Sequence, residues 1–396
     1  MWPYPIHAIL SEFLILPNNF LFAGAGTGKT ERVVNESIDL IREGKRVLVL
    51  TYTTSNQREI HDRFVLKNRK ADQAFAVKGL FTFYLEEMIR PYQRAIFPDR
   101  ICKFHFNDND PHKANGRTIP GRSEKINGKY NSIYYLTKDR AAAHSTYLAK
   151  LACAINKEAR GAPIRRLEKI YDHIFFDECQ DLVGWDYELL AMLSKCKSMS
   201  ITCVGDFRQT IYETAVTNKK PGTIAEKLAH LKKLGFNEEY MNESYRSVQS
   251  ICDFAAKIHE SEKFLPMMSA VIAPAGESHH VGVFVVKESN AREYIEQFHP
   301  VLLRHSVTSG TAYDDMPMKR ITFGKSKGLG FPRTIIIPTD SHLKFLQGNT
   351  KAFDQGKTEA PKNKCYVAFT RAQFSVAIIV PDKLVAKCNA TTWMPA

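Results

Sequence analysis

The sequence lacks the patterns that mark several classes of protein. Its 8 cysteines never fall in a C-x-x-C or Cys/His ligand spacing, so we expect reduced thiols and neither a zinc nor an iron–sulfur site. No apolar run reaches the roughly 18 residues of a membrane span, and no basic region opens the N-terminal stretch, so neither a membrane segment nor a signal peptide is expected. Internal repeats and low-complexity tracts are missing too. These absences favour a cytoplasmic protein of ordinary globular domains.

What the sequence does have is length and positive charge. Its 396 residues exceed one ordinary domain. Lysine and arginine number 55 against 42 aspartates and glutamates, a net charge of +13, which favours a polyanionic partner. Residues 91–169 hold 16 basic and 7 acidic side chains, a net charge of +9, without clear strand alternation. We expect a basic insertion there, the alternative being a merely solvated face.

Short apolar runs alternate with helix-like stretches along most of the chain. The runs are 20–23, 46–51, 173–176, 200–204, 281–286 and 334–337. Such alternation predicts parallel α/β sheets, and a gap after Thr223 predicts two of them in series, joined through Lys219–Gly222. The expected domains are a first one of residues 1–90 and 170–222, the insertion 91–169 within it, and a second one of residues 223–396.

The segment AGAGTGKT at 23–30 follows an apolar run and precedes a helix-like stretch. This context predicts a phosphate loop for ATP, with Lys29 on the β and γ oxygens and the Thr30 hydroxyl on Mg²⁺. Backbone N–H groups would surround the phosphates. They belong to Gly24, Ala25, Gly26, Thr27 and Gly28. The alternative is a chance glycine-rich turn before a helix.

A second acidic element, IFFDECQD at 174–181, closes another buried-looking run. Asp177 is the candidate ligand of Mg²⁺, and Glu178 is the candidate base that orients and deprotonates the attacking water. The alternative is an acidic helix N-terminus, where carboxylates favour the helix dipole. The phosphate loop upstream favours the catalytic interpretation.

The order of these motifs resembles that of the UvrD/Rep-like superfamily 1 helicases from Ala23 to Ala372. The matching blocks are TYTTSNQREIHDRF (51–64), GLFTFYLEEM (79–88), DECQD, VGDFRQTIY (204–212), NESYRS (242–247), TFGKSKGLGF (322–331) and CYVAFTRAQ (365–373). The resemblance implies two RecA-like P-loop NTPase domains in tandem. It also implies that Gln209 senses the γ-phosphate and that Arg246 and Arg371 are arginine fingers of the second domain. We expect Arg371 to be exposed, the alternative being local ion pairs.

By the same resemblance, two blocks of the first domain and one of the second touch a nucleic-acid strand. The implied contacts are Thr53, Asn56, Arg63, Phe81, Thr82, Phe83, Tyr84 and Lys327. For Phe81 and Phe83 core packing is equally consistent, because alternating aromatic residues at strand spacing are usually buried. The basic insertion is expected to add a second contact surface.

The sequence also departs from the family pattern. No glutamine precedes Gln57, although family members read adenine with an N-terminal glutamine, and Gly324 and Gly330 replace a histidine and a glutamate. About fifteen residues separate Ser306 from Ile321, too few for the large subdomain of longer relatives. Fewer than thirty residues follow Arg371, so we expect any nuclease to be a separate partner.

These observations lead to two expectations for function. The first is an ATP-dependent helicase or translocase with 3′ to 5′ polarity on single-stranded or partly duplex DNA. The alternative is a nucleic-acid-sensing regulatory ATPase that activates a partner, such as a nuclease or a defence or repair protein, without processive unwinding. A strand-displacement assay beside a DNA-stimulated ATPase assay separates the two.

Overall fold

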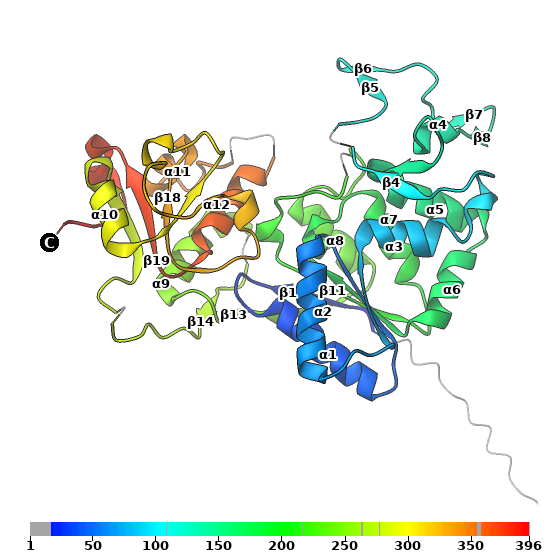
Figure 1. The fold of residues 1–396 in the computed structure, drawn as a ribbon, viewed down its shortest axis with the longest axis horizontal. Helices are drawn as coiled ribbons and strands as arrows, with labels where there is room; N and C mark the ends of the chain where they lie inside the picture. Colours follow the sequence, from blue (N-terminus) through cyan, green and yellow to red (C-terminus); the bar gives the residue numbers. More distant parts are fainter. Residues whose placement is uncertain are drawn as a thin grey trace, which may run out of the picture.

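The computed structural model describes residues 17–107, 109–215, 217–262, 264–276, 278–354 and 358–395. Two α/β lobes lie next to each other, and a group of short elements projects from the first lobe (Figure 1). Each lobe is built around a six-stranded sheet in which every strand pairing is parallel. No helix in these ranges is long and apolar enough to cross a membrane. The predicted α/β class with parallel sheets in series is confirmed.

The first sheet gathers strands from both sides of the insertion. In spatial order they are β12 (Asn237–Met241), β1 (Asn19–Ala23), β11 (Ser200–Gly205), β10 (His173–Asp177), β2 (Val47–Thr51) and β3 (Phe75–Gly79). The central strands are almost wholly apolar because helices cover both faces of a parallel sheet. Since the strands are parallel, the loops that follow β1, β10, β11 and β2 meet at one edge.

Alternate residues of these strands face two separate cores. Leu21 and Val49 face one core with α1 (Lys29–Arg42) and α2 (Thr54–Asn68). The next residues along, such as Phe20, face the other core. That core includes residues of α3 (Leu80–Phe83), η1 (Tyr84–Ile89), α5 (Leu148–Glu158), α6 (Ala162–Ile170), α7 (Trp185–Leu193) and α8 (Ile224–Lys233).

The second sheet has the order β17 (Arg320–Thr322), β16 (Val301–Arg304), β18 (Phe331–Ile336), β19 (Ala372–Val380), β15 (Gly282–Lys287) and β20 (Thr391–Thr392). One face packs against α9 (Gln249–Ala256), α11 (Asp340–Leu346) and α12 (Ala360–Phe369). The other face packs against α10 (Ala291–Phe298) and Trp393. The phosphate-loop residue Ala25 belongs to the core of this second lobe, so the lobes touch at the loop itself.

All six predicted apolar runs form strands, but one boundary between the lobes differs from the prediction. Residues 224–241 were expected in the second domain. Instead β12 pairs along β1 from Asn19↔Asn237 to Ala23↔Met241, and α8 packs into the core of the first lobe. An extra edge strand covers a sheet edge that would otherwise stay open. The chain therefore leaves the first sheet after Met241, at the small parallel pair β13 (Glu243–Ser244) and β14 (Met268–Ser269).

The insertion is part of the first lobe rather than a separate body. Its helices α5 and α6 share the core of the first sheet. Its remaining elements are short: β4 (Lys103–His105) with β9 (Ala142–His144), β5 (Lys113–Ala114) with β6 (Arg117–Thr118), β7 (Lys125–Ile126) with β8 (Lys129–Tyr130), and α4 (Ser132–Tyr135). In Figure 1 these short elements extend away from the sheet.

Candidate functional site

The phosphate loop joins β1 to α1. Gly26 and Gly28 both have φ of 78°, a left-handed value that suits glycine. A Cβ atom on Gly26 would lie 2.6 Å from the Cβ of Arg246, so this position also needs glycine because the segment around Arg246 packs on the loop. Ser244 Oγ donates a hydrogen bond to the Ala25 carbonyl at 3.2 Å. The loop is thus held from the second lobe while its other side opens on a pocket.

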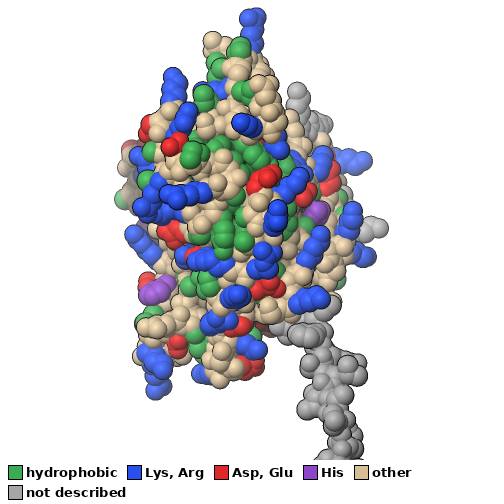
Figure 2. All heavy atoms as spheres, turned by 90° about the vertical axis from the view of Figure 1, so that its right-hand side faces the viewer, with side chains coloured by type: hydrophobic (Ala, Val, Ile, Leu, Met, Phe, Trp, Pro, Cys, Tyr) green, Lys and Arg blue, Asp and Glu red, His purple; other side chains and the backbone are tan. Residues whose placement is uncertain are grey.

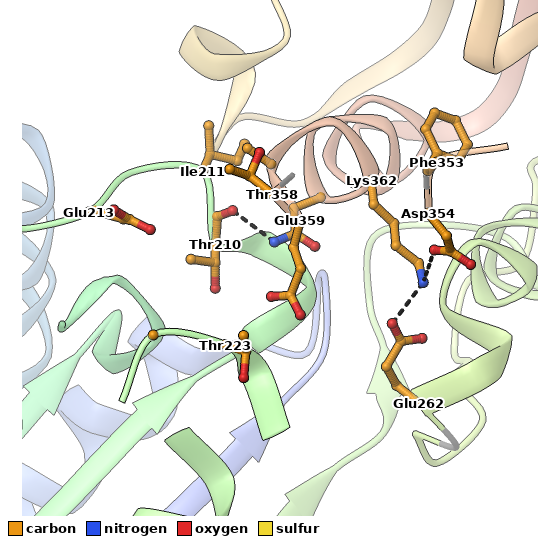
Figure 3. A pocket seen from close by; sticks show the side chains of 13 residues that line it. Thr210, Ile211, Glu213, Thr223, Glu262, Phe353, Asp354, Thr358, Glu359 and Lys362 are labelled. Atoms are coloured by element: carbon orange, nitrogen blue, oxygen red, sulfur yellow. Dashed lines mark hydrogen bonds and ion pairs between the residues drawn. The ribbon is translucent and has the colours of Figure 1, made fainter. Parts of the chain in front are cut away.

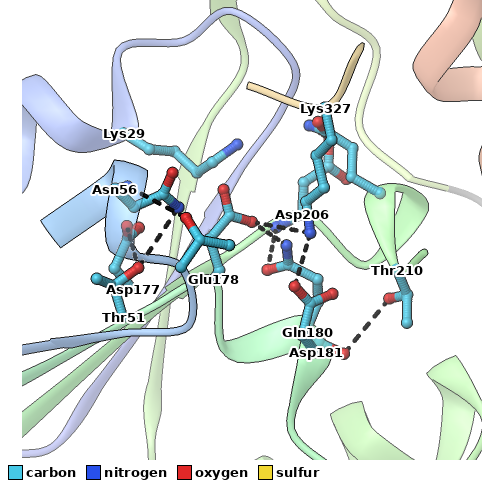
Figure 4. A network of polar contacts seen from close by, with 12 residues as sticks. Lys29, Thr51, Asn56, Asp177, Glu178, Gln180, Asp181, Asp206, Thr210 and Lys327 are labelled. Atoms are coloured by element: carbon cyan, nitrogen blue, oxygen red, sulfur yellow. Dashed lines mark hydrogen bonds and ion pairs between the residues drawn. The ribbon is translucent and has the colours of Figure 1, made fainter. Parts of the chain in front are cut away.

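Lys29 begins helix α1 and folds back over the loop. Its Nζ donates to the Ala23 carbonyl at 3.3 Å. Burial lowers the pKa of this ammonium group, and the carboxylates of Glu178, Asp206 and Asp177 act in the opposite direction. Figure 4 shows Lys29 extending over the same space as Glu178. One ammonium near three carboxylates suits a phosphate that arrives together with a divalent cation, because the cation balances the excess negative charge.

Asp177 ends strand β10 beside Thr51, the last residue of β2. Thr51 Oγ1 donates to Asp177 Oδ2 at 3.5 Å, and Asn56 Nδ2 donates to Thr51 Oγ1 at 3.4 Å (Figure 4). The other oxygen, Oδ1, is buried and has no hydrogen-bond partner among the described residues. Burial, and then the neighbouring Glu178, raise the pKa of Asp177 to about 7. A divalent cation would give Oδ1 a partner and would remove the energetic cost of burying an unpaired carboxylate oxygen.

The donor set therefore fits Mg²⁺, with Asp177 as the predicted ligand. Thr30 lines the adjacent pocket, so its hydroxyl is available as a second ligand. Over the described part of the chain, no group of three or more His, Cys, Asp or Glu side chains is arranged to hold a metal ion. Mg²⁺ needs no such cage, because it commonly takes one or two protein carboxylates and completes its shell with substrate phosphates and water.

Glu178 follows β10 with φ of 57°. This left-handed conformation is uncommon for a residue with a side chain and concentrates at functional sites. The carboxylate accepts a hydrogen bond from Gln180 and pairs with Lys327, whose Nζ lies 3.3 Å from Oε2. Burial alone would raise the pKa of Glu178, but Lys327 and Lys29 hold it below its ordinary value. The carboxylate is therefore ionised, which is the form that a general base requires.

Lys327 comes from the second lobe and crosses to the first, where it pairs with carboxylates, and its predicted contact with nucleic acid stays a prediction. Its side chain is only 10% exposed, and its Nζ also lies 2.7 Å from Asp181 Oδ2. Burial opposes the charge, yet Asp181 and Glu178 raise the pKa of Lys327 above its ordinary value. An ammonium held between two carboxylates has no unbalanced charge to offer a phosphodiester.

Gln209 links the two lobes directly. It lies in the turn after β11, where its Nε2 donates to Asp206 Oδ2 at 2.9 Å. Its Oε1 accepts from Arg371 Nη2 at 3.2 Å. Asp206 also accepts from Arg208 Nε at 2.8 Å. Burial alone would raise the pKa of Asp206, but Arg208 and Lys29 hold it low, so this connection between the lobes is charged and buried.

Arg371 lies at the end of α12, and the expectation that it is exposed is wrong. Its side chain is 0% exposed. Its Nε donates to the Val367 carbonyl at 2.9 Å and its Nη1 to the Leu329 carbonyl at 3.0 Å. A helix C-terminus leaves carbonyls without intrahelical partners, and the guanidinium satisfies one of them at Val367 while it also binds Leu329 and Gln209 of other segments. Burial, and then Arg246, lower the pKa of Arg371.

Arg246 is held more loosely than Arg371. It is half-buried, and among the described residues its side chain donates one hydrogen bond, from Nη1 to the Thr370 carbonyl at 3.4 Å. Burial lowers its pKa. A Cβ atom on Gly330 would come within 3.3 Å of its Nε, so the glycine that replaces the family's glutamate leaves space for this guanidinium.

These groups meet at one pocket of about 160 Å³. It is lined by Gly26, Thr27, Gly28, Lys29, Thr30, Glu31, Asn56, Glu59, Arg63, Glu178, Gln209, Arg246, Gly328 and Arg371. Both predicted arginines and the predicted base therefore face the phosphate loop, with residues from both lobes. Gly24 and Ala25 also belong to the loop, but they are buried and are not among the residues that line the pocket.

Asn56 and Arg63, predicted to contact nucleic acid, lie in this phosphate pocket instead. Both residues are on α2, which packs beside α1. Arg63 Nη1 donates to Glu31 Oε2 at 3.1 Å and its Nη2 to Glu59 Oε1 at 2.8 Å. Thr53 is the N-cap of α2, where its Oγ1 accepts from the Asn56 N–H at 3.1 Å. The block 51–64 thus shapes the nucleotide side of the lobe.

The block 79–88 is mostly core. Phe83 and Tyr84 are 0% and 1% exposed, and the Tyr84 hydroxyl donates to Asp186 Oδ1 at 2.7 Å. Their predicted contact with nucleic acid is therefore wrong, because short helical segments turn both rings into the first lobe. Phe81 is 9% exposed and Thr82 is half-buried. Of these predicted contacts only Thr82 keeps much accessible surface.

A larger cavity, of about 650 Å³, lies elsewhere between the lobes (Figure 3). Its lining includes Glu213, Glu262, Asp354 and Glu359, and Lys362 Nζ pairs with Glu262 at 2.7 Å and with Asp354 at 3.1 Å. A wall with four carboxylates and one already paired ammonium repels phosphates. The smaller pocket, which contains the phosphate loop, therefore suits a phosphate group better than the larger cavity does.

Two functional side chains were not predicted from the sequence. Asp206 anchors Gln209, and Asp181 anchors Lys327. Both stand inside blocks that were recognised, VGDFRQTIY and DECQD. The sequence feature that could have identified them is an acidic residue close to the predicted sensor Gln209 or to the predicted base Glu178.

Comparison with known proteins identifies one matching family model and several similar solved structures. A family model described as an AAA domain, AAA_19, matches residues 7–215. Among solved structures, the Arterivirus nonstructural protein 10 (helicase) aligns over 94% of this chain and 62% of its own, at 13% identity and a TM-score of 0.44. The same helicase in complex with DNA aligns over the same shares at 13% identity and a TM-score of 0.38.

The chain thus spans 62% of the length of these two structures. No curated protein matches the sequence. The family match, in contrast, covers more than half of the 396 residues and includes the phosphate loop, the Asp177–Glu178 pair and Gln209. The chain therefore belongs to the AAA_19 family of AAA domains.

Proposed function

We propose that the chain is an ATP-dependent DNA helicase or translocase that moves 3′ to 5′ on single-stranded DNA, driven by closure of two RecA-like lobes around ATP and Mg²⁺. One observation carries the proposal: Arg246 and Arg371 of the second lobe line the same pocket as the phosphate loop and Glu178 of the first. A nucleotide phosphate bound there would contact both lobes at once. The direction of movement rests on the family resemblance.

The residues of the pocket have separable tasks in this proposal. The phosphate loop and Lys29 hold the β and γ phosphates, and Glu178 takes a proton from the attacking water. Arg246 and Arg371 stabilise negative charge that develops on the γ-phosphate, to which Gln209 responds. Mg²⁺ held at Asp177 and Thr30 would neutralise phosphate charge. Loss of the γ-phosphate removes the shared contact between the lobes, which allows the lobes to separate.

The alternative is a regulatory ATPase that senses nucleic acid and activates a partner such as a nuclease. The observation that favours it is the pair between Lys327 and Glu178 at 3.3 Å. A lysine of the second lobe neutralises the proposed base of the first, so a strand that shifted one lobe against the other would switch hydrolysis on. This coupling does not require unwinding.

Hydrolysis and strand separation test these proposals together. ATP turnover should be measured with single-stranded DNA, duplex DNA and single-stranded RNA, and strand displacement on duplexes with a 3′ or a 5′ tail. Unwinding of only the 3′-tailed duplex supports the helicase. DNA-stimulated turnover without displacement or translocation supports the regulator, and turnover that no polymer changes contradicts both. GTP beside ATP tests nucleotide preference, since the segment where an adenine-reading glutamine is expected lies mostly outside the described residues.

A further inference from the structure

Four aromatic rings gather on the first lobe, next to the start of α2, and we call them the aromatic patch: Tyr52, Phe81, Phe104 and Phe106. The ring centroid of Phe81 lies 5.7 Å from each of the other three, and those of Phe104 and Phe106 are 5.2 Å apart. Phe81 is 9% exposed because the other rings surround it, whereas Phe106 is 65% exposed. The ring that a ligand can reach is therefore Phe106, which belongs to none of the recognised motif blocks.

The accessible part of the patch comes from the basic insertion. Phe104 lies in β4, and Phe106 follows one residue after that strand ends. Residues two apart in an extended segment point to the same side, which explains why both rings contact Phe81. Lys103 and His105, which alternate with them, are exposed. The insertion as a whole carries a net charge of +9 from 16 basic and 7 acidic side chains.

At its other end the patch approaches the boundary between the lobes. Tyr52 is half-buried and follows Thr51, which bonds to Asp177. Burial raises the pKa of the Tyr52 hydroxyl, and Asp181, Tyr212 and Lys327 are near enough to contribute. Tyr212 is 38% exposed, and the Lys327 Nζ lies 5.9 Å from the centre of its ring. Aromatic side chains thus lie both in the insertion and beside Lys327, the lysine that pairs with Glu178.

We propose that the aromatic patch is a base-stacking platform for a single-stranded nucleic acid, with Phe106 as the ring on which a base stacks. This inference rests on the proposed function and names a polymer contact for it. Flat aromatic rings match the π faces of bases, and stacking tolerates any sequence. The positive charge of the insertion complements a phosphate backbone. Figure 2 shows Lys and Arg side chains spread over the face of the molecule that carries the insertion, around an area of hydrophobic side chains.

The test compares Phe106→Ala with the unaltered chain in binding to fluorescent oligo(dT) and oligo(U) over a series of salt concentrations. Affinity should fall roughly 5- to 140-fold, because stacking contributes about 1–3 kcal/mol per base and about 1.4 kcal/mol is tenfold. The slope of log affinity against log salt should stay unchanged, since removing a ring releases no counterion. Phe106→Trp should retain binding, and 2-aminopurine in the strand should lose fluorescence quenching only with Phe106→Ala.

Ile126→Ala is the matched control, because Ile126 is 48% exposed and lies in β7 of the same insertion. It should bind like the unaltered chain. Ile126→Ala should also keep the ATP turnover and the thermal melt of the unaltered chain, and a thermal melt of Phe106→Ala checks that this variant is folded. Unchanged affinity of Phe106→Ala, beside an unaltered chain that binds strands, would overturn this inference and leave the proposed function standing. An unaltered chain that hydrolyses ATP but binds neither strand would overturn both.

Discussion

The phosphate pocket and the aromatic patch both use residues of the first lobe, but different kinds of structure place those residues. The pocket is built where parallel strands end, so the backbone itself places Asp177, Glu178 and the phosphate loop at one edge of the sheet. The patch is built by side chains of an irregular insertion that cover Phe81. The order of the motifs therefore predicts which side chains lie at the ends of the strands. Contacts with a nucleic acid cannot be predicted in this way, because they also depend on which side chains cover each motif.

The largest expected effect is on the pocket side, at Arg371. Arg371→Ala should lower ATP turnover on the order of 10³ to 10⁵ if it is a finger. It should also lower the free energy of unfolding by about 1–3 kcal/mol, because it removes the hydrogen bonds that the buried guanidinium donates to the Val367 and Leu329 carbonyls. Turnover assays beside chemical denaturation measure both quantities.

Arg246→Ala is the matched control for this prediction. It should lose turnover similarly but keep more stability, since Arg246 makes one hydrogen bond of 3.4 Å. Arg371→Lys should rescue poorly, because an ammonium cannot bridge several carbonyls and a phosphate at once. Near-normal turnover in Arg371→Lys would show that the residue is structural, and the pocket would then have one finger instead of two.

The next effect is expected at Glu178. Glu178→Gln should reduce turnover on the order of 10² to 10⁴ while nucleotide binding persists, because the amide keeps the shape but cannot take a proton. Lys29→Ala should instead weaken binding, since it removes the cation beside the phosphates. Retention of labelled ATP on the purified variants distinguishes the two. Equal loss of binding in both would mean that Glu178 acts only as the partner of Lys327.

A smaller effect concerns the pH dependence of stability at Asp177, without nucleotide and Mg²⁺. The pKa of about 7 in the folded state exceeds the ordinary 3.8, so between these values the folded chain binds more protons than the unfolded chain. Stability must therefore fall as pH rises across that window. Glu178 has a lowered pKa, and its contribution is lost only as pH falls below its ordinary value. Asp177→Asn should remove the part of this decline in stability that the titration of Asp177 causes.

The measurement is the difference in free energy of unfolding between Asp177→Asn and the unaltered chain at pH 5 and pH 7. The variant should gain relative stability at pH 7, and Mg²⁺ should reduce that gain. Titration of other groups, such as Asp181 with its pKa raised by burial to about 6, is common to both proteins and cancels. Parallel curves for the two proteins would show that Asp177 is not strained in the absence of a cation.

The sequence was sufficient to predict the two sheets because apolar runs mark six of their twelve strands, and the four runs of the first sheet each lead into a recognised block. It could not assign β12 to the first sheet, since NEEYM is largely polar and its pairing with β1 depends on a distant edge. It located Glu178 and Gln209 through their blocks, but not the burial of Arg371. That burial depends on oxygen atoms from three separate segments, those of Val367, Leu329 and Gln209.

The same limit applies to the predicted nucleic-acid contacts. Motif spacing fixes a residue's place along a helix but not what lies beside it. Asn56 and Arg63 line the phosphate pocket because α2 packs beside α1. Phe106, in contrast, belongs to no recognised motif. Only the structure shows that its side chain is 65% exposed and that its ring contacts Phe81.

The smallest expected effect concerns Thr53. The family resemblance predicts that Thr53 contacts the nucleic acid, whereas the structure places it at the N-terminus of α2. Its Oγ1 accepts from the Asn56 N–H at 3.1 Å, so Thr53→Ala should cost about 0.5–2 kcal/mol of stability, the usual cost of a lost N-cap. Thr53→Ser should keep the cap and the stability. Affinity for oligo(dT) should change less than in Phe106→Ala, because no base needs this hydroxyl. Chemical denaturation and anisotropy binding on the same three proteins measure this. If Thr53→Ala loses affinity while its stability is intact, the block 51–64 contacts the strand directly, and the division between pocket and patch drawn here does not hold.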